Sequence, residues 1–591
     1  MSLQSKRWQP KPKVSEQHLA RFGGIPPLIV QLLHNREIDD PGEAGDFLEG
    51  RFTGHDPFRL RGMNEAVTRL RSAIRSGDPI AVYGDFDTDG VTATALLVQA
   101  LSALGAQARP YIPHRVDEGY GLNLKALREL YRQGVRVVVT VDCGIRSIAE
   151  VDRARRGLDL IVTDHHSPSP GGQLPPAKAV INPKQPSCPY PFKDLSGVGL
   201  AYKLVQALFL AQRPKQQPAD LSEESPVDLV ALGTVADLAP LLGENRTLVR
   251  RGLEKLNQPG RPGVEALMAN AGVRRGEVDA TAIGFRLGPR LNAAGRLDSA
   301  MLAYNLLTGT DLMETKALAE ELGKLNQRRQ TLTEETVAAA EAQVLAGHPD
   351  AYLYLAAGPD FLPGIVGLAA SRLTEAFYRP SIVVELGEEE SRGSCRSIPE
   401  FDITAALDRC KDLLIRHGGH KAAAGFTVAT AKLEELRERL QAIAAEQLAG
   451  VELRPLLEID AEIPLAEVTW ATHDLLRQLE PCGVDNPQPV LLSRDVEVRE
   501  RRAIGSECKH LRLTLRDTWG VSWDAVYFRR GDLLDEVPGR VDVAYTLETS
   551  EWNHEKRLQL NVQDLRPATT DDESGLAPAG GDPVGSQGPL G

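Results

Sequence analysis

The sequence has few cysteines and no long apolar run, and each lack argues against a class of protein. Its six cysteines are scattered along 591 residues, without a Cys-x-x-Cys pair or regular spacing. This argues against both a disulfide framework and a structural zinc site. The most apolar stretches, such as 135–141, are too short to cross a bilayer, so no membrane association is expected. The opening residues, MSLQSKRWQPKPK, lack the apolar core of a signal peptide, and we expect a cytoplasmic protein.

Positive charge is also in deficit. The chain has 68 Lys and Arg against 81 Asp and Glu, a formal net charge of −13. Domains that bind nucleic acid usually carry a basic patch, so the total points away from that class. An enzyme that feeds a strand through a groove needs only local positive charge, however. Composition therefore leaves the substrate open.

What the chain does contain is an alternation of strand-like and helix-like segments. The strand-like segments are short, apolar and β-branched, and the segments between them favour helices. In order they are 79–83, 92–104, 108–112, 124–132, 135–141 and 158–162. This β-α-β-α succession predicts a parallel sheet with helices on both faces.

The remainder of the chain divides by composition. A segment free of proline and rich in helix formers predicts one long connector helix, and later alternating patterns predict a small β-barrel. The last stretch is rich in Gly, Pro, Asp and Ser and predicts disorder. The expected parts are an N-terminal extension packing on the first α/β domain (1–75), that domain (76–310), the connector helix (311–345), a second α/β domain (346–450), the β-barrel (455–567) and a disordered tail (568–591).

Acidic and histidine side chains stand directly after three of the predicted strands. They are Asp85, Asp87 and Asp89 after the first, Asp142 after another, and Asp164, His165 and His166 after a third. Loops at the carboxyl ends of parallel strands converge on one crevice, so these side chains can share one site. A further acid, Asp237, stands out in a predicted apolar helix.

Each of these motifs has another interpretation when taken alone. Asp-x-Asp-x-Asp-Gly also begins an EF-hand loop, but that loop needs Glu at its twelfth position, where this chain has Leu96. It also follows a helix, whereas a strand is predicted here. A solvated acidic turn stays possible for this motif, a capping role for Asp142 or Asp237, and structural roles for the two histidines.

Taken together, the acids point to bound cations. Two carboxylates about 5 Å apart repel by roughly 3 kcal/mol at an effective dielectric constant of about 20, so four or five in one crevice require positive charge. Mixed carboxylate and imidazole ligands suit Mn²⁺, and Mg²⁺ or Zn²⁺ less well. The number of ligands exceeds what one ion needs and predicts two, an arrangement that recurs in phosphoester hydrolysis.

Four motifs in this order resemble those of the DHH phosphoesterase superfamily, at 85–90, 142, 164–166 and 233–237. Further stretches resemble the RecJ exonuclease family up to about residue 567, namely 195–202, 288–297, 396–398 and 418–426. The resemblance implies an α/β fold in which a parallel-sheet DHH catalytic domain is joined by the long helix to a DHH-associated substrate-binding domain. An OB-fold β-barrel would follow, and then the tail.

The same resemblance implies the site residues. The manganese ligands would be Asp87, Asp89, Asp142, His165, His166 and Asp237, with Asp85 either a ligand or a neighbour of one. Asp164 would orient the histidine pair. Contacts to the 5′-phosphate and the strand would come from Arg115, Arg290, Arg296, Ser394, Arg396, Gly419 and His420. Each arginine taken singly is equally well explained by a surface salt bridge, except that this explanation is weaker for Arg396, which like His420 lies in a loop rich in glycine and serine.

The implied activity is that of a single-stranded-DNA-specific 5′-to-3′ exonuclease releasing 5′-mononucleotides, in DNA recombination and repair. Two divalent ions are implied, with Mn²⁺ preferred and Mg²⁺ possible. The implied partners are single-stranded DNA with a 5′ end, a single-stranded-DNA-binding protein and a RecQ-type helicase, with the enzyme itself a monomer. One alternative is a DHH phosphodiesterase for short oligonucleotides or dinucleotides, although such relatives generally lack the connector and barrel. Another is an inactive binding protein, although inactive relatives have lost motif acids that are all present here.

Overall fold

The computed structural model describes most of the chain and contains two compact units. The described residues are 5–52, 54–115, 117–119, 121–169, 171–212, 225–552 and 555–568. The larger unit comprises residues 45–453 and 479–487, and the smaller comprises residues 1–44, 454–478 and 488–591. None of the described helices combines the length and apolarity needed to span a bilayer.

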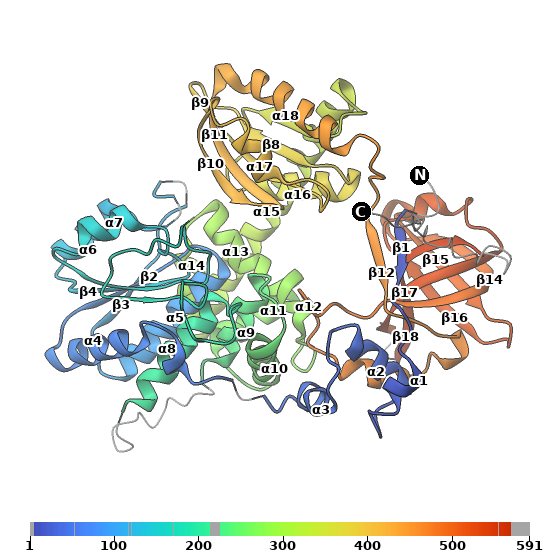
Figure 1. Cartoon of the computed structure of the whole chain (residues 1–591), viewed down its shortest axis with the longest axis horizontal. Helices are drawn as coiled ribbons and strands as arrows, with labels where there is room; N and C mark the ends of the chain where they lie inside the picture. The colour runs from blue at the N-terminus through green and yellow to red at the C-terminus, as the bar shows by residue number, and fades with distance from the viewer. Residues whose placement is uncertain are drawn as a thin grey trace, which may run out of the picture. The chain divides into compact units, whose positions relative to one another are not determined.

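The larger unit contains the predicted parallel sheet, with five strands in the order β3-β2-β4-β5-β6 (Figure 1). Its strands and the helices around them are α4 (Met63–Ser76), β2 (Ile80–Gly84), α5 (Thr88–Ala103), β3 (Ala108–Tyr111), α6 (Leu124–Arg132), β4 (Val137–Val141), α7 (Ile148–Ala154), β5 (Asp159–Thr163), β6 (Ala179–Ile181) and α8 (Gly197–Leu210). All the pairings are parallel, as expected.

Both faces of this sheet are covered, which explains why its strands are continuously apolar. Val137 and Val139 of β4 pack into a large core with α4, α5 and α8. Val138, between them, packs on the opposite face with α6 and α7. Figure 1 shows these two helix layers on either side of the sheet. Buried parallel strands typically have such runs because neither face meets water.

The strand order fixes where a site can form. From β2 the chain continues to β3 on one side and later to β4 on the other, so the loops after β2 and β4 diverge. Such a reversal leaves a crevice at the carboxyl ends of the strands. The predicted acidic loops therefore border the crevice.

Helices follow this sheet and lead to a second one. They are α9 (Val227–Ala236), α10 (Gly243–Leu256), α11 (Pro262–Ala271), α12 (Ala280–Ala282), the π-helical turn η3 (Ile283–Leu287), α13 (Gly288–Leu297), α14 (Met301–Thr308) and α15 (Leu312–Gly347). The last of these is the predicted connector, and it packs on α11, α13 and α14 and then on the next domain.

The second domain of this unit is a mixed five-stranded sheet in the order β10-β11-β9-β8-β7. Its elements are β7 (Tyr354–Gly358), α16 (Val366–Phe377), β8 (Ser381–Glu385), β9 (Glu390–Arg396), α17 (Ile403–Asp408), β10 (Leu414–His420), β11 (Ala423–Ala429) and α18 (Leu433–Leu448). Only β7 and β8 pair in parallel, and the other pairs are antiparallel.

The smaller unit holds the predicted barrel. Strands β14, β15, β16, β18 and β17 pair in that order, and pairing of β14 with β17 closes the ring. Its elements are α1 (Glu16–Leu19), α2 (Pro27–His34), β12 (Leu456–Ile459), β13 (Ala461–Glu462), α19 (Trp470–Arg477), β14 (Leu491–Ile504), β15 (His510–Arg516), β16 (Ser522–Tyr527), β17 (Arg540–Trp552) and β18 (Glu555–Pro567). Three of these strands are longer than the short strands expected.

The N-terminal segment departs from expectation. Instead of packing as a whole on the first α/β domain, its first part belongs to the smaller unit, where β1 (Arg7–Pro10) pairs in parallel with β12. The units divide within the next helix, α3 (Pro41–Glu49), and α4 packs on the first sheet. The reason is that the backbone of β12 offers hydrogen-bonding groups that β1 satisfies. Of the expected tail, residues 569–591 lie outside the described residues.

Candidate metal centre

The loop after β2 supplies three carboxylates to the crevice. Asp87 caps α5 by accepting a hydrogen bond from the Gly90 amide (3.1 Å), and Asp89 lies in the first turn of the helix. The buried Asp89 carboxylate accepts hydrogen bonds from the amides of Gly197 and Val198 (2.7 and 2.8 Å) at the start of α8. A helix N-terminus favours negative charge, so the α8 amides oppose the effect of burial on this carboxylate and fix its direction.

The loop after β4 presents Asp142. Its backbone is left-handed (φ 61°), a conformation that is uncommon for residues other than glycine and that Asp adopts more readily than most. Asp142 does not cap α7, whose N-cap is Ser147. The backbone of residue 197 lies so close to Asp142 and Asp89 that only glycine fits there. A Cβ at this position would lie 2.7 Å from the Asp142 Cβ and 2.8 Å from an Asp89 oxygen.

The loop after β5 holds the histidine pair. Asp164 Oδ2 accepts a hydrogen bond from the Ile145 amide (2.8 Å), and Oδ1 accepts one from the His166 amide (3.0 Å). The same oxygen lies 2.8 Å from His166 Nδ1. Metal-ligating histidines typically contact a carboxylate through their other ring nitrogen. Asp164 is thus placed to orient His166, the role that the resemblance implies.

Asp237 stands at the end of α9, one residue beyond the apolar helix in which the sequence placed it. Its Oδ2 lies 3.8 Å from His165 Nε2. A carboxylate at a helix C-terminus lies at the negative end of the helix dipole, so Asp237 does not stabilise α9 as a cap.

These side chains form three overlapping groups. In each, one donor atom per residue lies within 4.8 Å of the others. The groups are Asp142, His165 and His166; Asp89, His165 and Asp237; and Asp85, Asp87 and Asp142. Sharing of Asp142 and His165 joins the three into one continuous centre, which contains every residue predicted as a metal ligand.

Unsatisfied atoms in this centre fit a bound cation. Asp85 Oδ1, Asp142 Oδ1 and His165 Nε2 are buried, and none has a hydrogen-bond partner within the described chain. Buried polar atoms in proteins are almost always paired, so these three require another partner. The number and kind of donors suit two divalent ions.

The electrostatics lead to the same requirement. Burial, with the negative charge of Asp87, raises the pKa of Asp89 to about 7, and burial with Asp89 raises that of Asp237 to about 9. Burial also lowers the pKa of His165 to about 3, so this imidazole is neutral and available as a ligand. Without cations these carboxylates cannot all ionise together at neutral pH. Bound divalent ions lower the pKa values of these carboxylates and so favour their ionised forms.

Arginines adjoin the carboxylates. Arg296 is half-buried, and its pKa is lowered to about 10, first by desolvation and then by the positive charges of Arg115, Arg329 and Arg396. Its acidic neighbour is Asp87. Within the described residues, none of Arg115, Arg296 and Arg396 forms an ion pair within 4.0 Å, so the surface salt-bridge interpretation does not apply to them. Concentrated, unpaired guanidinium groups are suited to phosphate.

Arg329 is a member of this group that the sequence analysis missed. It lies on the connector helix α15, its Nε is buried without a hydrogen-bond partner in the described chain, and burial lowers its pKa. The uniform helical pattern gave no reason to single it out. Arg290 of α13, which was predicted, lines a polar groove of about 550 Å³ with Asn270 of α11 and Lys324 of α15.

The other predicted substrate contacts lie on the second sheet. Arg396 on β9, Ala423 on β11 and His420 on β10 occupy one row across three paired strands. Arg396 Nη1 lies 3.4 Å from Ser394 Oγ. Gly419 permits the tight hairpin, since a Cβ there would lie 2.3 Å from the Ala423 carbonyl oxygen. Among the described residues, no hydrogen bond or ion pair joins Gly419 or His420 to the carboxylate centre.

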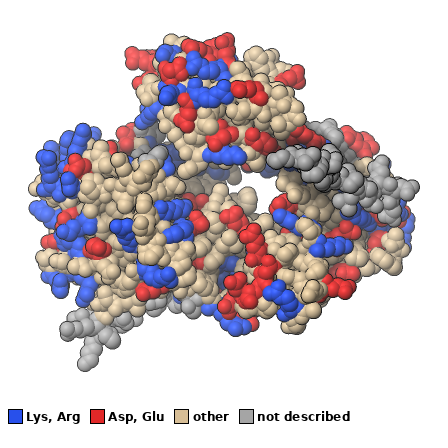
Figure 2. Space-filling view, viewed as in Figure 1, with Lys and Arg blue, Asp and Glu red and all other residues tan. Residues whose placement is uncertain are grey.

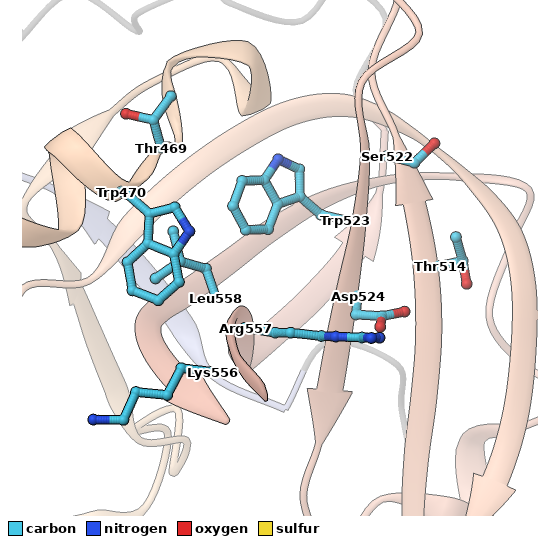
Figure 3. Close-up of a pocket in the computed structure, with 9 residues that line it drawn as sticks. All are labelled: Thr469, Trp470, Thr514, Ser522, Trp523, Asp524, Lys556, Arg557 and Leu558. Atoms are coloured by element: carbon cyan, nitrogen blue, oxygen red, sulfur yellow. The ribbon is translucent and has the colours of Figure 1, made fainter. Parts of the chain in front are cut away.

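The barrel of the smaller unit has a groove of its own, of about 590 Å³. Figure 3 shows the indole rings of Trp470 and Trp523 on one side of it and the side chains of Lys556 and Arg557 near them. Trp470 is 46% exposed, whereas Trp523 donates a hydrogen bond to the Leu465 carbonyl oxygen (3.2 Å). An exposed indole beside cationic chains can stack on a nucleobase.

Surface charge is unevenly distributed despite the net acidity. Figure 2 shows Lys and Arg side chains gathered over the region of α6 and α7, with acidic side chains scattered elsewhere on that face. Those two helices carry Arg128, Arg132 and Arg153. The total of −13 therefore does not exclude local positive surfaces.

Comparisons with known families match three parts of the chain. Residues 79–234 match the DHH family, N-terminal domain, residues 350–446 the DHHA1 domain, and residues 459–564 the RecJ OB domain. The first and second of these matches cover the two α/β domains of the larger unit, and the third covers the barrel.

Whole-chain relatives agree with these matches. The "single-stranded-DNA-specific exonuclease RecJ" of Bacillus subtilis (strain 168) is 38% identical over 91% of this chain and 68% of its own. The crystal structure of RecJ with Mn²⁺ from Thermus thermophilus superposes with a TM-score of 0.81 at 31% identity, over 95% of this chain and 80% of the other. The structure of that protein with Mg²⁺ gives a TM-score of 0.76 at 30% identity, over 95% and 79%. With likeness in sequence and in fold extending along nearly its whole length, the chain belongs to the RecJ family.

Proposed function

We propose that this protein is a single-stranded-DNA-specific exonuclease that degrades strands from the 5′ end and releases 5′-mononucleotides in DNA recombination and repair. The observation that carries the proposal is the joined carboxylate and histidine centre with arginines beside it. Hydrolysis of a phosphodiester requires charge stabilisation on both sides of the phosphorus. This centre offers ligands for two divalent ions, and the arginines offer charge for the phosphate groups.

In this mechanism the chain's own residues bind, orient and balance charge. Asp87, Asp89, Asp142, His165, His166 and Asp237 would hold two divalent ions, Mn²⁺ or Mg²⁺, which would supply an activated water and offset charge on the attacking and leaving oxygens. Asp164 fixes the orientation of the His166 ring. The α8 amides fix the Asp89 carboxylate. Arg115 and Arg296 balance the phosphate charge next to Asp87.

The parts of the chain divide this work. Residues 76–310 would carry the chemistry, residues 346–450 would bind the 5′ end through Arg396 and its neighbours, and the barrel at 455–567 would bind the incoming strand. A single-stranded-DNA-binding protein and a RecQ-type helicase are proposed as partners of a monomeric enzyme on the family resemblance. Co-sedimentation of the purified chain with each of them tests that part separately.

The main experiment follows the fate of one long single strand labelled at its 5′ or its 3′ end. In Mn²⁺ we expect the 5′ label to appear at once as a mononucleotide, while the 3′ label stays on shortening strands. Activity confined to dinucleotides or very short oligonucleotides would instead support the phosphodiesterase alternative. Binding without hydrolysis would support an inactive binding protein.

Arg396→Ala is expected to remove the preference for a 5′-phosphate. The guanidinium of Arg396 lies beside Ser394, is an electrostatic neighbour of Arg296, and is half-buried, so solvent screens its charge less than that of a surface arginine. Charge-assisted hydrogen bonds are worth roughly 1.5–3 kcal/mol, or about 10- to 150-fold in affinity. A terminal phosphate has more charge and one more oxygen than an internal diester, so the loss falls mainly on phosphorylated ends.

The measurement compares the affinities of wild type and variant for 5′-phosphorylated and 5′-hydroxyl strands of one sequence. Arg392→Ala is the matched control, because Arg392 is an exposed arginine on the same strand, β9. It should leave the preference unchanged. A uniform drop on both strands for Arg396→Ala would refute the end-reading role.

Trp470→Ala is expected to weaken binding of long strands while sparing cleavage of short oligonucleotides. Stacking of one base on an aromatic ring is worth about 1–3 kcal/mol, so a loss of roughly 5- to 150-fold in affinity is expected. Trp519→Ala is the control, since Trp519 is 71% exposed on the same barrel and is not among the residues lining the groove. Equal effects of the two substitutions, measured by fluorescence anisotropy of a labelled strand, would exclude a specific stacking role for Trp470.

A further inference from the structure

A second set of metal-ligating side chains lies in the smaller unit. His18 is on α1, His34 is the last residue of α2, and Asp39 follows the turn after α2. One donor atom from each lies within 4.8 Å of the others. None of the three belongs to the motifs of the carboxylate and histidine centre, and no family resemblance assigns them a role.

The distances are close to those of a metal site. Asp39 Oδ1 lies 2.6 Å from His34 Nδ1 and 3.5 Å from His18 Nε2. With bonds of about 2.0–2.2 Å to a tetrahedral Zn²⁺, ligand atoms lie roughly 3.3–3.6 Å apart. One separation already falls in this range. Side-chain shifts of about 1 Å would bring the others to it.

One ligand atom lacks any other partner. His18 Nε2 is buried, and within the described chain it has no hydrogen-bond partner. Phe22 packs against the His18 ring at a centroid distance of 5.1 Å. The His18 and His34 rings meet edge-on, at 62° and 5.1 Å, which lets ring nitrogens converge on one point. A buried His18 Nε2 without a hydrogen-bond partner, next to the Asp39 carboxylate, suggests that a metal ion binds between the two.

The backbone holds the ligands in place without the ion. Glu37 is left-handed (φ 61°), and the Ile38 amide donates to the Leu33 carbonyl oxygen (3.0 Å), which reverses the chain after α2. Arg21 Nη2 donates to the Asp39 carbonyl oxygen (3.1 Å). These contacts bring Asp39 back to both helices, so little ordering is left for metal binding to achieve.

Exposure and donor chemistry also favour a cation. His34 and Asp39 are 42% and 51% exposed, which gives an ion access and leaves room for a water ligand. Two imidazoles with a carboxylate form a donor set used for Zn²⁺, whereas Mg²⁺ and Ca²⁺ prefer oxygen ligands alone.

We infer that His18, His34 and Asp39 bind one Zn²⁺ ion that links α1 to the end of α2. The scattered cysteines argued against a zinc site, but this donor set contains no thiolate. The site lies outside the proposed nuclease centre, and its role is to tie the N-terminal helices together.

The experiment counts zinc in the full-length chain. Wild type and a His18→Gln/His34→Gln variant are stripped with chelator, equilibrated with Zn²⁺, freed of loose ions by gel filtration and analysed for zinc per chain. We expect the variant to hold one zinc ion fewer per chain than wild type, however many ions the carboxylate and histidine centre retains. His348→Gln, at the exposed end of α15, is the control and should match wild type.

A second variant protects the result against misfolding. Asp39→Asn keeps the shape of the side chain but loses its charge, and we expect it to weaken zinc binding about tenfold or more. Circular dichroism establishes that each variant is folded. Equal zinc content in wild type and a folded double variant would overturn the inference. So would an Asp39→Asn affinity equal to that of wild type.

Discussion

His165→Ala is expected to reduce hydrolysis of a single strand by more than about 100-fold in saturating Mn²⁺, because loss of a mere neighbour of a metal ligand already costs about 10- to 100-fold. His165 contributes to two of the three overlapping groups, so its removal affects the ligands of both ions. His165 Nε2 lies 3.1 Å from Asp142 Oδ1 and 3.8 Å from Asp237 Oδ2. Among the described residues, no other histidine contacts both of these carboxylates. Asp89→Ala should cause a loss of similar size, since it removes a ligand fixed by the amides of α8.

The fold should survive both substitutions. Burial holds the pKa of His165 near 3, so its removal takes away a neutral ring and leaves no unpaired charge. Removal of Asp89 relieves repulsion with Asp87. The measurement combines release of mononucleotides with thermal unfolding, and His348→Ala serves as the control. Near-wild-type turnover of either variant would show that the assigned centre is wrong.

The first sheet could be predicted closely because its strands carry a local signal. Each is a short β-branched run, buried on both faces, and β2, β4 and β5 begin within two residues of the predicted positions. The start of α5 was placed too late, at 92 instead of Thr88. The cause is that Asp87 caps this helix, a role that the sequence analysis did not consider for it.

Long-range features had no such signal. The pairing of β1 with β12 joins residues about 450 positions apart, and nothing local in either segment names its partner. Arg329 lies in a helix whose pattern is uniform, and only folding brings it beside Arg296. Arg396 was predicted from its serine and glycine neighbours, but its proximity to Arg296 depends on packing between the two α/β domains. Most of the predicted metal ligands were found because their motifs follow strands, whereas Asp237 stood out as an acid at the end of an apolar helix.

Affinity for Mg²⁺ is expected to fall about 100-fold as the pH is lowered from about 9 to about 7, since one displaced proton changes affinity about tenfold per pH unit. Burial and the charge of Asp89 raise the pKa of Asp237 to about 9, above its unfolded value of 3.8, so the metal-free chain keeps this proton through that window. An ion must displace the proton, and binding therefore strengthens as the pH rises and levels off above about 9. Below about pH 7 the proton of Asp89 must also leave, and the dependence should steepen.

Mg²⁺ is the suitable probe because Mn²⁺ oxidises readily in alkaline solution. Calorimetric titration in two buffers of different ionisation enthalpy counts the protons released with each ion bound. The control is Asp237→Asn, which removes the titrating group and should bind more weakly but with a flatter profile between about pH 7 and about pH 9. Binding in the wild type that is independent of pH, with no proton released, would mean that Asp237 is ionised before the ion arrives. The crowding of carboxylates would then be relieved by some other charge, and the arginines beside Asp87 would be the groups to substitute next.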